Sequence, residues 1–130
     1  MIVDCDVVQA DGGTRSAAIT GGCLALIQAF GKMNALGMIR QMPVKNLVSA
    51  VSVGLVGGRL LLDLDYGEDS SAEVDMNFVV TRDGLFVEIQ GTAEAMPFPR
   101  DLHDRMTDLA LQGCAYLTGK QIELAGDLVR

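Results

Sequence analysis

Two pairs of extended segments, each joined at a glycine, constrain the fold of this chain more than any other feature of its sequence. In the first pair, residues 50–56 and 59–65 flank Gly57-Gly58; in the second, residues 74–81 and 85–90 flank Asp83-Gly84. Gly-Gly and Asp-Gly dipeptides supply the positive φ angles that tight turns between antiparallel strands require. We therefore expect two successive β-hairpins.

Segments with helical patterns lie on either side of these hairpins. Residues 15–30 carry almost no charge, so we expect a helix buried on most sides, with Gly21-Gly22 in close contact with another element. A final helix is predicted from an N-cap at Asp101 to a terminator at Gly126. Its apolar stripe recurs at steps of three or four residues: Leu102, Met106, Leu109, Gly113 and Leu117.

Residues 2–8 alternate apolar and polar side chains, which predicts a further strand before the first helix. The resulting order is β-α-β-β-β-β-α, an α+β fold in which two main helices pack on a largely antiparallel or mixed sheet. No repeat, low-complexity tract or linker interrupts the chain, so we expect residues 1–130 to form a single domain.

The composition indicates a folded, acidic protein. Hydrophobic residues make up 49% of the 130 residues, and 17 Asp plus Glu outnumber 10 Lys plus Arg, giving a net charge of −7. Such a charge is not typical of a general nucleic-acid binder, which needs a basic surface. The three widely spaced cysteines predict reduced, core-filling thiols in a cytoplasmic protein. We expect no membrane span and no secretory signal.

A glycine turn between a predicted strand and a predicted helix is the first candidate site. Residues 11–16 read Asp-Gly-Gly-Thr-Arg-Ser. The start of a helix exposes unpaired N–H groups that bind anions, two glycines allow close backbone approach, and Arg15 can grip a phosphate. Thr14 and Ser16 add hydroxyl donors. The alternative is an ordinary tight turn with Thr14 as a helix cap.

An acidic cluster around residues 63–75 is the second candidate. Alternation along the strand places Asp75 and Asn77 on one face, and a two-residue turn at Asp83-Gly84 would set Asn77 opposite Gln90 and Asp75 opposite Thr92. Grouped carboxylates favour a bound Mg²⁺ or Mn²⁺, or a carboxyl group that donates a proton. The alternative is a solvated loop. His103, the only histidine, is expected on the surface.

The chain resembles the C-terminal half of the ribonuclease PH family, phosphate-dependent exoribonucleases that trim tRNA 3′ ends. Five stretches carry the resemblance in the family's order: VDCDVVQADGGTR (3–15), AVSVG (50–54), DLDYGEDS (63–70), DMN (75–77) and EIQGTAE (88–94). The implied fold is of the ribonuclease PH, ribosomal protein S5 domain 2-like type.

This resemblance implies phosphorolysis, in which inorganic phosphate removes the terminal nucleotide of RNA as a nucleoside diphosphate. Phosphate would be bound by Gly13, Thr14, Arg15 and Ser16, and Arg15 would also be catalytic. Asp69 and Asp75 would be the acidic pair that holds Mg²⁺ or Mn²⁺ and assists as an acid.

Family members are about twice this length, and the half not represented here carries a further phosphate-contacting arginine and much of the RNA-binding surface. Three interpretations follow. The chain is a catalytic half that acts on a tRNA 3′ end when an N-terminal half is supplied. Alternatively, it is a non-catalytic structural or binding subunit, or an engineered half-domain. In each case, exposed apolar surface should drive homo-oligomerisation or association with a separate N-terminal half.

Overall fold

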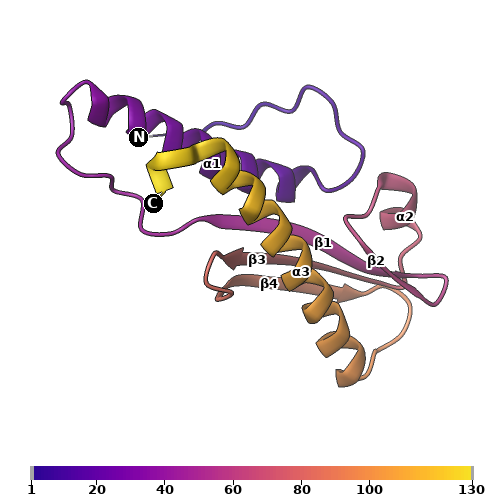
Figure 1. Ribbon diagram of the computed structural model, residues 1–130. Helices are drawn as coiled ribbons and strands as arrows, with labels where there is room; N and C mark the ends of the chain where they lie inside the picture. The colour runs from indigo at the N-terminus through magenta and orange to yellow at the C-terminus, as the bar shows by residue number, and fades with distance from the viewer. Residues whose placement is uncertain (1, 130) are drawn as a thin grey trace.

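A computed structural model describes residues 2–129 and shows a four-stranded sheet with two long helices (Figure 1). The helices and strands occur in the order α1 (Thr14–Ala35), β1 (Val48–Val56), β2 (Arg59–Leu62), α2 (Tyr66–Ser70), β3 (Val74–Thr81), β4 (Phe86–Ala93) and α3 (Arg100–Ala125), followed by a 3₁₀ turn (Gly126–Val129).

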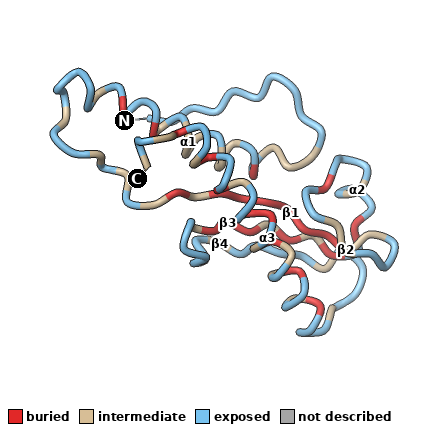
Figure 2. The backbone as a smooth tube through the Cα atoms, viewed as in Figure 1, coloured by how far each residue is buried: buried red, intermediate tan, exposed pale blue. Residues whose placement is uncertain are grey.

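The sheet confirms the predicted α+β class. Its strands are ordered β2-β1-β3-β4, and every neighbouring pair is antiparallel. In Figure 1, α3 crosses one face of the sheet, α1 lies along β1, and the short α2 stands above β2 in this view. Buried residues concentrate on the two central strands, whereas β4 is largely exposed (Figure 2).

Both predicted hairpins form, with differences at their ends. Gly57 and Gly58, at φ 55° and 74°, join β1 to β2, which ends at Leu62 rather than at residue 65. The second turn has three residues, because Thr81 N donates to Leu85 O. Val79 pairs with Glu88 and Val80 with Phe86, so Val87 is an extra residue that restores the register.

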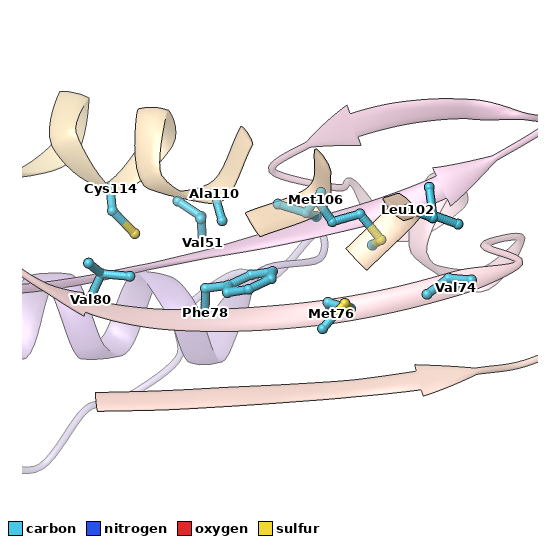
Figure 3. Packing of buried hydrophobic residues seen from close by; sticks show 10 residues of the cluster. Val51, Val74, Met76, Phe78, Val80, Leu102, Met106, Ala110 and Cys114 are labelled. Atoms are coloured by element: carbon cyan, nitrogen blue, oxygen red, sulfur yellow. The ribbon is translucent and has the colours of Figure 1, made fainter. Parts of the chain in front are cut away.

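The main core lies between α3 and the sheet (Figure 3). Because side chains alternate along a strand, one face of β3 carries an unbroken apolar row that packs against α3. The buried members of this cluster are Val51, Val53, Val74, Met76, Phe78, Val80, Leu102, Met106, Ala110 and Cys114. A smaller cluster of Ile27, Leu47 and Ala125 joins the later part of α1 to the end of α3.

The strand predicted for residues 2–8 is absent. This segment runs beside α1, where Val3 Cγ1 and Cys5 Sγ would lie 3.5 and 3.6 Å from a Cβ placed on Gly22. Its apolar side chains are largely exposed, Val8 by 95%. The alternating pattern is present, but a strand also needs a partner, and none pairs with it in residues 2–129. Cys5 is likewise exposed, so the core-filling prediction is wrong for this thiol.

Helix α1 is less buried than its composition predicts. Of its 22 residues only Ser16, Ile27 and Gly31 are buried. A Cβ on Gly31 would meet the Leu128 side chain at 2.7 Å, whereas Gly21 faces open space. The expectation of a helix buried on most sides is wrong for the described chain, because β1 and α3 cover only one side of it.

Side chains from both long helices bind the part of β1 that extends beyond β2. Thr20 Oγ1 accepts from Ala50 N at 3.0 Å, and Val48 N donates to Cys23 Sγ at 3.4 Å. Gln121 Nε2 donates to Val48 O and to Thr20 O, both at 2.9 Å. The bonds to Val48 and Ala50 satisfy groups on the edge of β1 that a neighbouring strand would otherwise pair.

Helix α3 begins two residues earlier than predicted. Its N-cap is Pro99, and Asp101 lies within the first turn instead of capping it. Gly126, at φ 57°, ends the helix as predicted. Among residues 2–129, no helix is long and apolar enough to cross a membrane.

Replacing Gln121 by Leu tests the contacts at the β1 edge. Gln121→Leu removes the side-chain donor to the part-buried Val48 carbonyl, so we expect the free energy of unfolding to fall by roughly 1–3 kcal/mol in urea denaturation. The matched control is Gln112→Leu, an exposed position of the same helix, which should change stability by less than about 0.5 kcal/mol. Equal effects of the two substitutions would show that the Gln121 bonds contribute nothing.

Candidate functional site

The glycine turn forms an uncapped helix start. Gly13, at φ 57°, is the N-cap of α1, no side chain bonds to the first turn, and no acidic residue lies in it. The alternative in which Thr14 is the cap is therefore wrong. Ala17 N donates to Gly13 O at 2.9 Å, and the preceding amides of the helix have no partner within it. A helix start of this kind favours an anion.

The turn rests against the chain that leads into α2. A Cβ on Gly12 would collide with the Leu64 carbonyl oxygen and lie 2.8 Å from the Asp65 carbonyl carbon, and its φ of 78° also requires glycine. Asp11 Oδ1 accepts a hydrogen bond of 3.4 Å from Tyr66 N. These contacts fix the turn relative to the helix that carries Asp69.

Ser52 and Asp63 form the corner that makes this approach possible. The sequence predicted Asp63 only as a member of the acidic cluster, and it assigned no role to Ser52. Ser52 Oγ accepts from Leu64 N at 3.0 Å, and Ser52 O accepts from Asp63 N at 2.8 Å. Asp63 has φ 62°, the one non-glycine residue with a positive φ in residues 2–129. The chain then enters α2 through a capping box of Asp65 and Glu68.

A polar row links the start of α1 to the acidic strand. Ser16 Oγ lies 3.3 Å from Asn77 Oδ1, and Asn77 Nδ2 lies 3.4 Å from Asp75 Oδ2. The predicted register is confirmed: Asn77 pairs with Gln90 and Asp75 with Thr92. Asp75 and Asn77 therefore share the sheet face opposite the apolar row, as their alternation predicts.

The surroundings of Asp75 shift the pKa of its carboxyl group. Burial raises its pKa above the ordinary value, and the charges of Asp69 and Glu94 raise the pKa further. Its Oδ1 atom is buried and makes no hydrogen bond within the described chain. Such an oxygen favours a bound proton or a cation.

Arg15 extends over the same region and is held by a residue that sequence reasoning did not assign to the site. Its Nη2 lies 2.8 Å from Glu88 Oε2, and the two side chains are 52% and 39% exposed. The hydrogen bond and charge of Glu88 raise the pKa of Arg15. The signal for Glu88 was available: it lies two residues before Gln90 on the same face of β4.

Asp69 and Asp75 are the candidate ligands of this chain for a divalent ion. No group of three or more His, Cys, Asp or Glu side chains in residues 2–129 is arranged to hold a metal. Asp69 and Asp75 remain a candidate pair, and the unpartnered Asp75 oxygen fits a hard cation. Mg²⁺ commonly takes its other ligands from water and substrate phosphate, so two carboxylates match its chemistry.

The predicted residues gather on an open surface rather than in one cavity. A hollow of about 450 Å³ between α1 and α3 includes Gly13 and Ser16 but not Arg15, Asp69 or Asp75. His103 lies elsewhere, half-buried in the first turn of α3 beside Asp104. The polar row of Ser16, Asn77 and Asp75 is thus what joins the two candidate clusters.

Gly12→Ala tests how closely the turn must approach the α2 segment. We expect the variant to lose about 1–3 kcal/mol of unfolding free energy more than Gly37→Ala, because both positions have positive φ but only Gly12 meets backbone. Chemical denaturation of the two variants measures the difference. Equal losses would mean that the turn can move away from residues 64–66 without cost.

Comparison with known proteins places this arrangement in a family. The model for the 3′ exoribonuclease family, domain 2, matches residues 46–113. Ribonuclease PH of Bdellovibrio bacteriovorus is 51% identical over all 130 residues, which span 54% of that protein. The chain therefore covers about half the length of this curated relative.

Solved structures with the same fold are more distant in sequence. Rice (Oryza sativa) Rrp46 has a TM-score of 0.64 at 21% identity, covering 94% of this chain and 51% of the other. The Archaeoglobus fulgidus exosome with RNA bound to its active site has a TM-score of 0.70 at 20% identity, and the match covers 87% of this chain and 45% of the other. An archaeal exosome core has a TM-score of 0.69 at 18% identity, and the match covers 90% of this chain and 47% of the other. The family model matches more than half of the chain, and the alignment to ribonuclease PH includes every residue of it. The chain therefore belongs to the ribonuclease PH group of the 3′ exoribonuclease family and corresponds to the C-terminal half of its members.

Proposed function

We propose that this chain provides the phosphate-binding and acidic half of a phosphorolytic 3′→5′ exoribonuclease that removes nucleotides from tRNA 3′ ends in the cytoplasm. One observation carries the proposal above all: the uncapped start of α1 and the carboxyl group of Asp75 are joined through Ser16 and Asn77 on one face. A helix start that can bind an anion, next to a carboxyl group with a raised pKa, suits transfer of a phosphoryl group between oxygens.

Inorganic phosphate is the proposed co-substrate, bound by Gly13, Thr14, Arg15 and Ser16. The backbone amides at the start of α1 and the two hydroxyl groups offer hydrogen bonds, and the Arg15 guanidinium offsets the negative charge. A phosphate oxygen would attack the terminal phosphodiester phosphorus. The bond to the 3′ oxygen of the preceding nucleotide breaks, and the products are a nucleoside diphosphate and RNA shortened by one nucleotide.

The 3′ oxygen that leaves must acquire a proton. The raised pKa of Asp75 and its unpartnered Oδ1 support a role in holding that proton. With Asp75 ionised, Asp69 and Asp75 would instead hold Mg²⁺ or Mn²⁺, an ion whose chemistry is to stabilise negative charge on oxygen. Arg15 would stabilise charge as the phosphate approaches, because it lies at the same helix start.

RNA binding by the assembled protein needs basic surface from outside this chain, since the chain carries a net charge of −7. We propose that a separate N-terminal half supplies it and covers apolar surface left open here. Exposed apolar side chains occur in residues 2–8 and in and beside β4, among them Leu85, Val87 and Ile89. The same exposed surface supports the second candidate, a non-catalytic subunit or half-domain that self-associates.

Arg15→Ala distinguishes the catalytic proposal from the structural one. The chain is mixed with the N-terminal half of the Bdellovibrio ribonuclease PH, Mg²⁺, inorganic phosphate and a tRNA with extra 3′ nucleotides. We expect release of nucleoside diphosphate, reduced by roughly 100-fold or more in Arg15→Ala because charge stabilisation in the transition state is lost.

Arg59→Ala, at an exposed arginine in the β1–β2 hairpin, is the matched control and should retain activity. Circular dichroism checks that each variant folds. Absence of nucleoside diphosphate with wild-type chain and partner present would contradict phosphorolysis. Equal activity of Arg15→Ala and Arg59→Ala would remove Arg15 from the reaction.

Native mass spectrometry tests the proposed association. Because the apolar surface around β4 and residues 2–8 is open, we expect the chain alone to form homo-oligomers and to form a mixed complex when the N-terminal half is added. Replacing Val87 and Ile89 by Thr should shift the mass distribution towards monomer. A chain that stays monomeric at micromolar concentration in both conditions would refute association through this surface.

A further inference from the structure

Glu88 occupies a defined position on the face that carries the proposed site. It pairs with Val79 in the β3–β4 register and immediately follows the extra residue Val87. Bulges of this kind turn neighbouring side chains out of the regular strand direction. The position of Glu88 is therefore fixed by the sheet rather than by a mobile loop.

The contact between Glu88 and Arg15 uses only part of the guanidinium. Nη2 of Arg15 meets Glu88 Oε2 at 2.8 Å, while Nε and Nη1 make no hydrogen bond to any residue in 2–129. A planar guanidinium presents five N–H donors in a fixed arrangement. Once one nitrogen is held, the directions of the other donors are limited as well.

We propose that Glu88 is a positioning residue that anchors Arg15 through Nη2 and leaves Nε and Nη1 to bind inorganic phosphate, an inference that rests on the phosphate seat of the proposed function. Arg15 is a long, half-exposed side chain with no other polar contact in the described chain. Ordering it before phosphate arrives removes an entropic cost from the binding step.

The charge of Glu88 and its contact with Arg15 have opposite effects on the affinity for phosphate. A carboxylate near a phosphate site repels the anion, so removing the charge alone should tighten phosphate binding. Glu88→Gln keeps an oxygen acceptor and removes the charge. Glu88→Ala removes both, so comparing these two neutral variants isolates the anchor.

The experiment titrates the full chain with inorganic phosphate and separately measures the ¹H–¹⁵N heteronuclear NOE of Arg15 Nε without phosphate. We expect Nε to be ordered in wild type and Glu88→Gln and mobile in Glu88→Ala. Phosphate should bind roughly threefold more weakly to Glu88→Ala than to Glu88→Gln, the scale of a single hydrogen bond on a partly exposed surface. Gln112→Ala, at an exposed position of α3 away from this face, should match wild type in both measurements.

Two results would overturn the inference: equal phosphate affinity of Glu88→Ala and Glu88→Gln, or an Nε that stays ordered in Glu88→Ala. If no form of the chain binds phosphate, the proposed phosphate seat fails. The Nε measurement then still decides whether Glu88 holds Arg15, supporting the anchor if order is lost in Glu88→Ala and refuting it if order persists.

Discussion

The unequal lengths of β1 and β2 set the constraint on which this structure depends. β1 runs over nine residues and β2 over four, so part of the outer edge of β1 has no neighbouring strand. Thr20 and Cys23 of α1 and Gln121 of α3 bind the amide and carbonyl groups that this edge leaves without a strand partner. Backbone polar groups removed from water need partners, and here the partners are helical side chains. Because helical side chains take the place of a neighbouring strand, α1 is held beside the sheet, and the position of the first turn of α1 is set.

From that placement the site is built by contacts between distant segments. Ser52 in β1 holds the corner at residues 63–64, and the corner provides the surface on which Gly12 rests. One end of α1 therefore meets the loop before α2, while Ser16 reaches β3. The acidic residues and the helix start share a face because the same strand, β1, positions the corner, α1 and β3.

Local chemistry made much of the fold predictable. Gly57-Gly58 and Asp83-Gly84 specified their hairpins, and Asn77 faces Gln90 because the extra Val87 offsets the longer turn. Residues that depend on distant partners escaped prediction. The alternating pattern of residues 2–8 cannot show that no strand pairs with them, and the apolar composition of α1 cannot show which sides are covered. The roles of Ser52, Asp63 and Glu88 depend on contacts with segments that are distant in the sequence, so no local pattern predicts them.

The hydrogen bond from Tyr66 to Asp11 joins residues 55 positions apart. Closing so long a loop carries an entropic cost that local turns do not bear, and contacts of this separation slow folding. The hairpins can nucleate from neighbouring residues, but the glycine turn acquires its shape only after the corner behind β2 exists. During synthesis, residues 11–16 leave the ribosome well before the segment that supports them, so we expect the glycine turn to reach its final geometry late in the folding of the chain.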